Sequence, residues 1–281
     1  MYLQNILSIA QKKLSSNNFV AFKHYVKKIL KITSSDIVLN SVNIKLKSCD
    51  IKKLFKFIQK ANKNYPLAYL FKEQDFGKNT FYVNSHTLIP REDSMTLVEN
   101  FFHNFTNSNQ ELKILDLGVG SGCLIITLLQ NYQNASGVGI DINFNTLFVA
   151  KKNLKKFNLK NKCQLICNNM LNGINKTIYP KFDAIISNPP YISYNDTNIA
   201  NDVKKYEPKR ALFASHNGLY FYTKIFSQAH LILKKDGIII VEVGFEQQKD
   251  VEKIAHSYNY KLISITKDNQ GINRSLAFIH N

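Results

Sequence analysis

Residues 112–122 read LKILDLGVGSG, in which an apolar run leads directly into three closely spaced glycines. The run predicts a buried strand, and the apolar residues that follow at helical spacing predict a helix. Glycines at a turn between a strand and a helix let the backbone approach a ligand closely. Their Gly-x-Gly-x-Gly spacing differs from the Gly-x-Gly-x-x-Gly pattern of dinucleotide-binding proteins. The segment therefore predicts the first strand, loop and helix of a nucleotide-type α/β fold.

Strand and helix patterns alternate from this segment onward. Strands are expected at Leu112–Leu117, Gly137–Ile142, Cys163–Cys167, Phe182–Ser187, Gly237–Val243, Lys261–Ile265 and Leu276–Ile279. Helices are expected at Gly122–Tyr132, Asn145–Phe157 and Leu219–Leu233, and a further helix after Ser94. The turn at 268–271 is too short for a helix, so the last two strands are expected to form a hairpin. The pattern predicts an α/β, doubly wound, Rossmann-like sheet of seven strands.

The first ~85 residues have a different pattern and a different charge. Apolar residues recur there at helical spacing, with Asp36 and Asp50 as expected helix N-caps. This part holds 15 lysines and four acidic residues, which is +11 of the formal net charge of +17. We predict a helical domain at 1–73, a hairpin linker at 74–90 and a second domain at 91–281.

The positive charge alone does not identify a nucleic-acid partner. Only three of the 37 basic residues are arginines, whose planar fork most often reads bases and grips phosphates. A lysine-rich chain with little arginine also results from A/T-rich codons. The charge therefore leaves three explanations open: a solvated surface, compositional drift and a docking surface.

The composition argues against several other classes of protein. With 44% hydrophobic residues the chain can bury a core, which argues against global disorder. It has no run of ~18 apolar residues, so we expect no membrane span, and residues 1–13 lack the layout of a secretion signal. Four cysteines without paired spacing fit a reducing compartment and predict no metal site. We expect a cytoplasmic protein.

The strand that follows the Gly-rich segment ends at Asp141, 23 residues after Gly118. An acidic residue there can accept hydrogen bonds from ribose hydroxyls, or it can cap the next helix. Together, the glycines and this acid resemble the S-adenosylmethionine site of class I methyltransferases. Asp116 is placed either near the methionine portion of that cofactor or as a residue that fixes the turn.

The fourth strand ends in Asn188-Pro189-Pro190-Tyr191. In a doubly wound sheet this end lies beside the Gly-rich loop. An amide or aromatic amino nitrogen is a poor nucleophile because its lone pair is delocalised. The Asn188 side-chain oxygen and the Pro189 carbonyl can accept from its two N–H bonds, while Tyr191 can stack on the amide and suits a nearby sulfonium. Such positioning recovers ~7–11 kcal/mol of a bimolecular barrier. The proton can leave after the transfer, so no dedicated base is required. A strand end with a packed tyrosine is the structural alternative.

The same tetrapeptide signature occurs in methyltransferases of DNA adenine, of rRNA amino groups and of protein glutamine. Several flanking segments resemble the protein-(glutamine-N5) methyltransferases that modify peptide chain release factors. These segments are Pro66-Leu67-Ala68-Tyr69-Leu70, Thr87-Leu88-Ile89-Pro90-Arg91, Ile114–Gly118, Glu207-Pro208 with Ala211-Leu212, and Gly271–Arg274. The resemblance implies the glutamine of the Gly-Gly-Gln motif of class I release factors as target, S-adenosyl-L-methionine as methyl donor, and a helical N-terminal domain that binds the factor.

The resemblance also implies site residues. Those implied to bind the cofactor are Gly118, Val119, Gly120, Ser121, Gly122, Asp141, Met170 and Asn188. Those implied to hold the glutamine amide are Asn188, Pro189, Pro190 and Tyr191, with Asn188, Pro189 and Tyr191 as catalytic residues.

The sequence departs from the family pattern in two places. Asn169-Met170 replaces an Asp-aromatic pair near the adenine, and Glu92-Asp93-Ser94 replaces a Pro-(Asp/Glu)-Thr segment, where a capping role survives. Three further acidic or basic residues also require explanation. We expect Arg91 to form an ion pair in domain packing in preference to a direct ligand contact. Glu207 is expected to cap a helix or form an ion pair, with orientation of the substrate loop as the alternative. Glu242, inside an apolar strand, is expected to need a partner or to face the mouth of the cleft.

Three functions remain open from the sequence. The leading one is methylation of release-factor glutamine by a monomer without obligatory nucleic acid, membrane or metal. The alternative is a DNA or RNA exocyclic-amino methyltransferase that uses the same Asn-Pro-Pro-Tyr chemistry, with steep salt dependence of binding. The third is a cofactor-binding protein without catalysis that contacts the ribosome or RNA.

Overall fold

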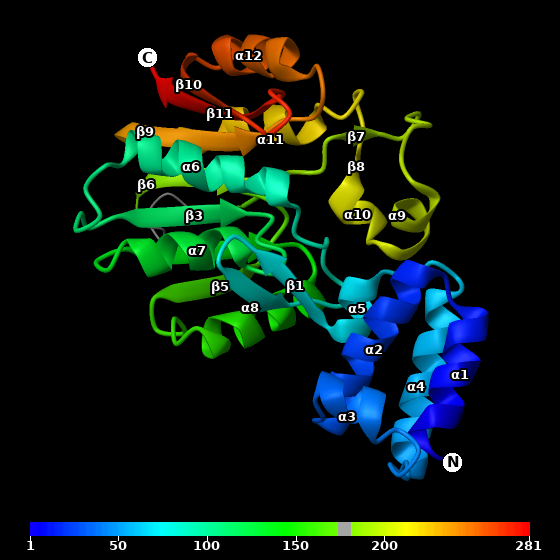
Figure 1. Cartoon of the computed structure of the whole chain (residues 1–281). Helices are drawn as coiled ribbons and strands as arrows, with labels where there is room; N and C mark the ends of the chain where they lie inside the picture. Colours follow the sequence, from blue (N-terminus) through cyan, green and yellow to red (C-terminus); the bar gives the residue numbers. More distant parts are fainter. Residues whose placement is uncertain (174–180) are drawn as a thin grey trace. The chain divides into compact units, whose positions relative to one another are not determined.

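The computed structural model describes residues 1–173 and 181–281, and the chain divides into two compact units (Figure 1). Unit 1 is Met1–Lys72 and unit 2 is Glu73–Asn281. Unit 1 is entirely helical. Its helices are α1 (Leu3–Lys13), α2 (Ser16–Leu30), α3 (Ser34–Leu39), α4 (Ser48–Ala61) and α5 (Leu67–Phe71).

Unit 1 has its own apolar core. The inward faces of α1, α2 and α4 bury Ile6, Phe22, Val26, Leu54 and Phe57, all at most 1% exposed. The Phe57 ring packs against Phe22, with ring centroids 5.5 Å apart. The amphipathic pattern of the sequence therefore predicted these three helices, because each buries one apolar stripe.

The expected N-caps of unit 1 are wrong by three residues. Thr33 caps α3: its side chain accepts from the Asp36 backbone N–H at 3.1 Å, and Asp36 accepts from the Thr33 N–H at 2.9 Å. Asp50 likewise lies in the first turn of α4, whose N-cap is Lys47. Both acids thus occupy first-turn positions, where the positive helix end also favours a carboxylate.

Unit 2 is built on a seven-stranded sheet in the order β10-β11-β9-β6-β3-β4-β5. Neighbouring strands from β9 to β5 run parallel, whereas β11 runs antiparallel to both β9 and β10. The predicted doubly wound, mostly parallel sheet with a terminal hairpin is confirmed. The strands are β3 (Lys113–Leu117), β4 (Ser136–Asp141), β5 (Cys163–Cys167), β6 (Phe182–Ser187), β9 (Leu233–Glu242), β10 (Tyr260–Lys267) and β11 (Asn273–His280).

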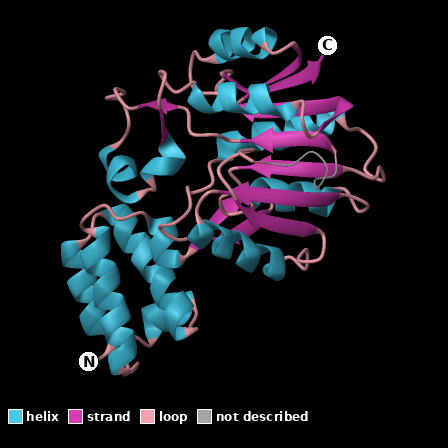
Figure 2. Cartoon of the chain, turned by 180° about the vertical axis from the view of Figure 1, so that it is seen from behind, coloured by secondary structure: helices cyan, strands magenta, loops and turns pink. Residues whose placement is uncertain are grey.

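Helices cover both faces of this sheet (Figure 2). Alternate strand residues face opposite layers: Ile114 packs with α6 (Met95–Asn104), α7 (Cys123–Asn131) and α8 (Phe144–Lys156), whereas Leu115 packs with α11 (Tyr220–Ala229) and α12 (Gln248–Ser257). Both faces are therefore buried, which explains the nearly continuous apolar runs of the central strands.

The segment expected as a linker at 74–90 belongs instead to unit 2. It contains β1 (Glu73–Phe76) and β2 (Asn79–Tyr82), which pair antiparallel. Phe76 and Phe81 are fully buried in the same core as α6 and α7. An aromatic hairpin that buries both rings is part of the domain, and the sequence pattern of the hairpin does not reveal that packing.

A small layer of structure follows the Asn-Pro-Pro-Tyr segment. It consists of β7 (Ile192–Ser193), α9 (Asn201–Tyr206), α10 (Lys209–Leu212) and β8 (Phe213–Ala214), in which β7 and β8 pair in parallel. Earlier in the chain, before β3, a short 3-10 helix, η1 (Glu92–Ser94), leads into α6. Both segments meet the carboxyl ends of the central strands through the residues described next.

Candidate active site

The Gly-rich loop between β3 and α7 has a backbone that glycine alone adopts readily. Gly118, Gly120 and Gly122 have φ of 78°, 54° and 82°. The N–H groups of Gly118 and Val119 both donate to the carbonyl of Ile140 in β4, at 2.8 and 2.9 Å. The loop is therefore held against the neighbouring strand in a fixed shape.

Asp141, the last residue of β4, also holds this loop. Its Oδ2 accepts from the Gly120 N–H at 3.2 Å, and its Oδ1 accepts from the Asn143 N–H at 2.9 Å. Burial raises the pKa of this carboxyl group. Asp141 does not cap α8: that role belongs to Asn143, whose side chain accepts from the Asn145 N–H. Each Asp141 oxygen keeps a lone pair for a ligand hydroxyl.

A cavity of about 410 Å³ lies at these strand ends. Its size is typical of a small-molecule site. It brings together most of the residues that the sequence singled out, namely Gly118, Val119, Gly120, Ser121, Asp141, Asn169, Met170, Asn188 and Pro190. Three others lie outside its lining: Gly122 precedes α7, Pro189 is buried, and Tyr191 packs against the apolar layer under α11.

The end of β6 carries Asn188 to the cavity. Ser187 Oγ donates to the carbonyl of Leu117 at 2.6 Å, which ties the ends of β6 and β3 together. A Cβ atom at Gly118 would lie 4.0 Å from the backbone oxygen of Asn188, so the Gly-rich loop and the motif are neighbours. Asn188 Nδ2 donates to Ser94 Oγ at 2.9 Å. In the described part of the chain, nothing donates to Asn188 Oδ1.

Tyr191 is fixed from two sides. Its hydroxyl donates to Glu242 Oε1 at 3.1 Å, and its carbonyl accepts from Gln247 Nε2 at 2.9 Å. The charge of Glu242, with burial, raises the pKa of Tyr191, so the phenol remains a donor. Gly218, with φ of 87°, approaches so closely that a Cβ atom would lie 2.0 Å from the Tyr191 carbonyl oxygen.

Ser94 and Glu242 are site residues that the sequence analysis did not identify as such. Ser94 stands at the N-cap position of α6 but makes no side-chain cap bond, contrary to the expected capping role. Its Oγ donates to Glu242 Oε2 at 2.5 Å. Glu242 is 2% exposed, and burial raises its pKa to about 7. The only available signal was an acid at the end of an apolar strand.

Arg91 and Glu207 form an ion pair within unit 2. Glu207 is 5% exposed, and its Oε2 also accepts from the Ile89 N–H at 3.0 Å. The pair joins the segment before η1 to the loop that follows Tyr191, and Arg91 also lines the cavity. An ion pair for both residues agrees with the sequence analysis, although it links two walls of one cavity and not two domains.

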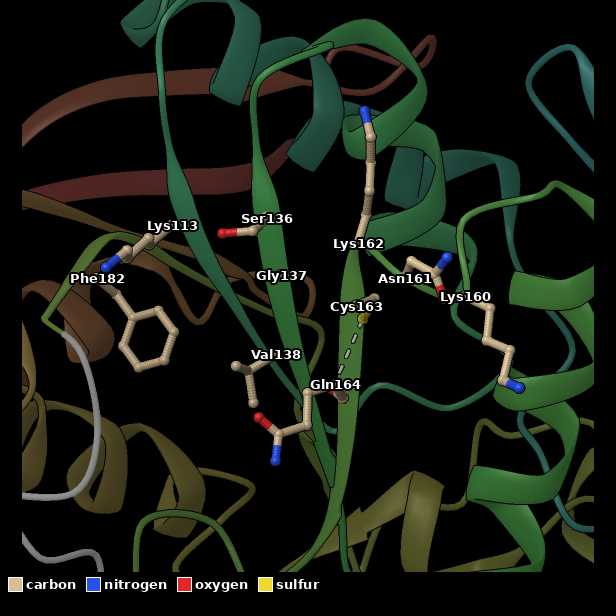
Figure 3. A pocket seen from close by; sticks show the side chains of 10 residues that line it. All are labelled: Lys113, Ser136, Gly137, Val138, Lys160, Asn161, Lys162, Cys163, Gln164 and Phe182. Carbon is tan, nitrogen blue, oxygen red and sulfur yellow. Dashed lines mark hydrogen bonds between the residues drawn. The ribbon is translucent and has the colours of Figure 1, made fainter.

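A second hollow of about 370 Å³ lies at the opposite, amino edge of β3, β4 and β5. Lys113, Lys160 and Lys162 line it, but their side chains point in different directions (Figure 3). Lys162 Nζ is already engaged by the Gln133 carbonyl at 2.5 Å. The described residues that line this hollow therefore do not converge on a common point. Within residues 1–173 and 181–281, no cluster of His, Cys, Asp and Glu could hold a metal ion, and no helix is long and apolar enough to cross a bilayer.

Known proteins resemble this chain in both sequence and fold. Residues 92–205 match the family model of the methyltransferase small domain. The chain is 36% identical over 258 residues to the release factor glutamine methyltransferase of Mycoplasma mycoides, covering 90% of each. It is 36% identical over 255 residues to the bifunctional methyltransferase of Rickettsia prowazekii, covering 84% of this chain and 49% of that protein. The chain thus spans about half the length of such bifunctional relatives. A methyltransferase structure from Pyrococcus furiosus gives a TM-score of 0.51 at 15% identity, covering 83% of this chain and 98% of that one.

The sheet order, the loop after β3 and the acid at the end of β4 define the fold of class I S-adenosylmethionine-dependent methyltransferases. The sequence identity to the Mycoplasma protein shows a relationship closer than a shared fold, because it covers nine tenths of both chains. The chain belongs to the release factor glutamine methyltransferase family. The family resemblance seen in the sequence is confirmed.

Proposed function

We propose that the protein transfers a methyl group from S-adenosylmethionine to the side-chain amide nitrogen (N5) of the glutamine in the Gly-Gly-Gln motif of class I release factors. The observation that carries the proposal is Asn188: it lines the cavity beside the Gly-rich loop, with Nδ2 engaged and Oδ1 left to accept. Family membership supports glutamine as the target.

The residues of the cavity suit this cofactor. Asp141 has unused lone pairs for ribose hydroxyls, and Met170 supplies an apolar surface for adenine. Asp116 is 1% exposed, and neither of its carboxyl oxygens has a partner in the described chain. A cationic ligand beside the adjacent loop would offset that buried charge. When bound, the cofactor supplies an electrophilic methyl group on a sulfonium.

The protein's contribution is to hold the amide. The Asn188 side-chain oxygen and the Pro189 carbonyl accept from the two N–H bonds of the glutamine, which orients its nitrogen. Held in this way, the nitrogen would accept the methyl group that the bound cofactor supplies and would then lose one proton to water. Because that proton leaves after transfer, the site needs no strong base, and positioning supplies most of the acceleration.

Unit 1 is proposed to hold the release factor. It carries 14 lysines and two acidic residues, a net charge of +12, and so suits an acidic protein surface. We further propose that the protein acts as a monomer in the cytoplasm. The four cysteines support a reducing compartment, since none of them forms a disulfide in the described residues.

The experiment uses labelled S-adenosylmethionine with three acceptors: a recombinant class I release factor, its Gly-Gly-Gln variant with glutamine replaced by alanine, and total RNA with DNA. Label on the unaltered factor alone is expected. Label on nucleic acid with none on the factor would establish the alternative amino-methyltransferase function and overturn the proposal.

Asn188→Ala is expected to abolish detectable transfer, because it removes one of the two acceptors that hold the amide. The dissociation constant for S-adenosylmethionine, measured by calorimetry, should change little. Asn161→Ala, at an exposed position on the opposite edge of the sheet, is the matched control. A variant that methylates the factor at the wild-type rate would contradict the role given to Asn188.

A further inference from the structure

We propose that Glu242 is a positioning residue for methyl transfer, which acts through Ser94 to set which end of the Asn188 amide faces the substrate. It also fixes Tyr191. This inference rests on the proposed function, because it explains how the amide-binding group acquires its orientation.

The geometry is a continuous chain of hydrogen bonds from the sheet to the motif. Glu242 is the last residue of β9, and its two oxygens accept separately: Oε2 from Ser94 Oγ at 2.5 Å and Oε1 from the Tyr191 hydroxyl at 3.1 Å. Ser94 Oγ in turn accepts from Asn188 Nδ2 at 2.9 Å. One carboxylate thus reaches both ends of the Asn-Pro-Pro-Tyr segment.

The direction of each bond follows from the carboxylate. An ionised Glu242 has no proton to donate, so the single hydroxyl proton of Ser94 must point at it. The Ser94 oxygen can then only accept from Asn188. The two ends of an asparagine amide have nearly the same shape, but only Nδ2 can donate. The oxygen of Asn188 is therefore left for the substrate.

The opposite amide orientation would disable the site. It would present the Nδ2 donors of Asn188 to the N–H donors of the glutamine, and no hydrogen bond would form. An unpaired polar group in such a site is costly, so one orientation is strongly favoured. Glu242 thus determines a choice that side-chain packing around Asn188 cannot make.

The surroundings of Glu242 place its protonation near neutral pH. Burial raises its pKa, and the hydrogen bonds from Ser94 and Tyr191 oppose that rise only in part, so the pKa is about 7. Its backbone oxygen accepts from the Tyr222 hydroxyl at 2.8 Å. The titratable and charged groups around it are Asp93, Cys123, Tyr191, Tyr222 and Arg274. A protonated Glu242 can itself donate to Ser94 Oγ. The Ser94 hydroxyl is then no longer required to point at Glu242, and it can donate to Asn188 instead.

The test is a pH profile of kcat for the wild type and two variants. The wild-type kcat should rise through pH 7 as Glu242 ionises. In Glu242→Gln the new amide can donate to Ser94, which frees the serine proton for Asn188 Oδ1 and favours the flipped amide. We expect kcat to fall about 10–100-fold with loss of the rise near pH 7, while KM for both substrates changes little. Ser94→Ala should have the same effect, and Glu99→Gln, an exposed acid on α6, should leave the profile unchanged.

A second readout separates this inference from the proposed function. The side-chain amide resonances of Asn188, followed by NMR without substrate, should shift with a midpoint near pH 7 in the wild type and remain constant in Glu242→Gln. If the amide titrates in this way but the wild type leaves the release factor unlabelled, the proposed function fails and the positioning role stands. If the wild type labels the factor but Glu242→Gln keeps both kcat and the rise near pH 7, the positioning role is wrong.

Discussion

Two buried carboxyl groups face the same layer of unit 2. Asp116 and Glu242 are 1% and 2% exposed, and burial raises the pKa of each to about 7. Their pKa values in the unfolded chain are near 4, so the folded protein binds more protons between these limits. Their contribution to stability is therefore fully present below pH 4 and is lost as the pH rises through 7.

This linkage can be measured as a difference between variants. The free energy of unfolding of the wild type, relative to Asp116→Asn, should fall by roughly 1–3 kcal/mol between pH 5 and pH 8. Urea titrations at several pH values give this difference, and Asp183→Asn, an acid paired with Lys234 at the surface, is the control. A difference that stays constant with pH would show that Asp116 is ionised in the folded protein throughout.

The motifs around Gly118 and Asn188 were predictable from the sequence because each lies within one short segment at the end of a strand. The chain of hydrogen bonds from Asn188 through Ser94 to Glu242 was not predictable. Ser94 and Glu242 are 148 residues apart, and Ser94 resembled a helix cap. Local pattern cannot distinguish a serine that caps a helix from one that bonds across the fold.

At the level of elements, one asparagine joins three segments. Asn153 of α8 is fully buried, and its side chain exchanges hydrogen bonds with the backbone N–H and carbonyl of Tyr82 in β2, at 2.7 and 2.9 Å. Its Nδ2 also donates to the Ser121 carbonyl at 2.8 Å. The hairpin and the Gly-rich loop thus share one anchor, so the hairpin supports the shape of the cofactor loop.

Asn153→Ala should destabilise the protein by about 2–4 kcal/mol, because it leaves backbone groups of both segments without partners. Urea denaturation measures this loss, and affinity for S-adenosylmethionine should fall as well because the loop is released. Asn145→Ala, which changes an exposed side chain of the same helix, should have little effect on either quantity. Loss of stability without loss of cofactor affinity would show that the loop keeps its shape without the hairpin.

The type of each sheet element was predictable, whereas its ends and neighbours were less so. The predicted strand at 163–167 matches β5, but β9 begins at Leu233, four residues before the predicted Gly237. Residues 234–236 are two lysines and an aspartate with exposed side chains, which do not show an apolar strand pattern. The paired residues of β9 are Leu233 and Ile238–Glu242. The hairpin was predicted, but its burial depends on contacts with α6 and α7, which begin at Met95 and Cys123, outside the hairpin segment.

On the scale of the whole molecule, charge is divided unevenly. Unit 1 carries a net +12 of the total +17, which leaves +5 for the much larger unit 2. The charge that we propose to suit a protein partner is therefore concentrated in a different unit from the residues proposed to carry the chemistry. Recognition and transfer should accordingly respond to different substitutions.

The double variant Lys52→Glu/Lys56→Glu tests this separation on the exposed face of α4. We expect KM for the release factor to rise about 3–10-fold, with little change in kcat, because the altered charges act on encounter with the partner. The effect should shrink as salt screens the charges. Lys235→Glu/Lys261→Glu, at the amino edge of the sheet, makes the same charge change and should leave KM unaltered. Equal effects from both pairs would show that total charge, and not unit 1, matters.

The place of β11 in the sheet has a consequence for biosynthesis. β11 lies between β9 and β10, although the ribosome makes it after both, and its Leu276, Ala277 and Phe278 are fully buried. While the chain is being made, the facing edges of these two strands have no partner, and apolar surface beneath α11 stays uncovered. Such edges favour pairing with other chains. The nascent protein thus passes through a stage at which its sheet is split, and only its final strand closes it.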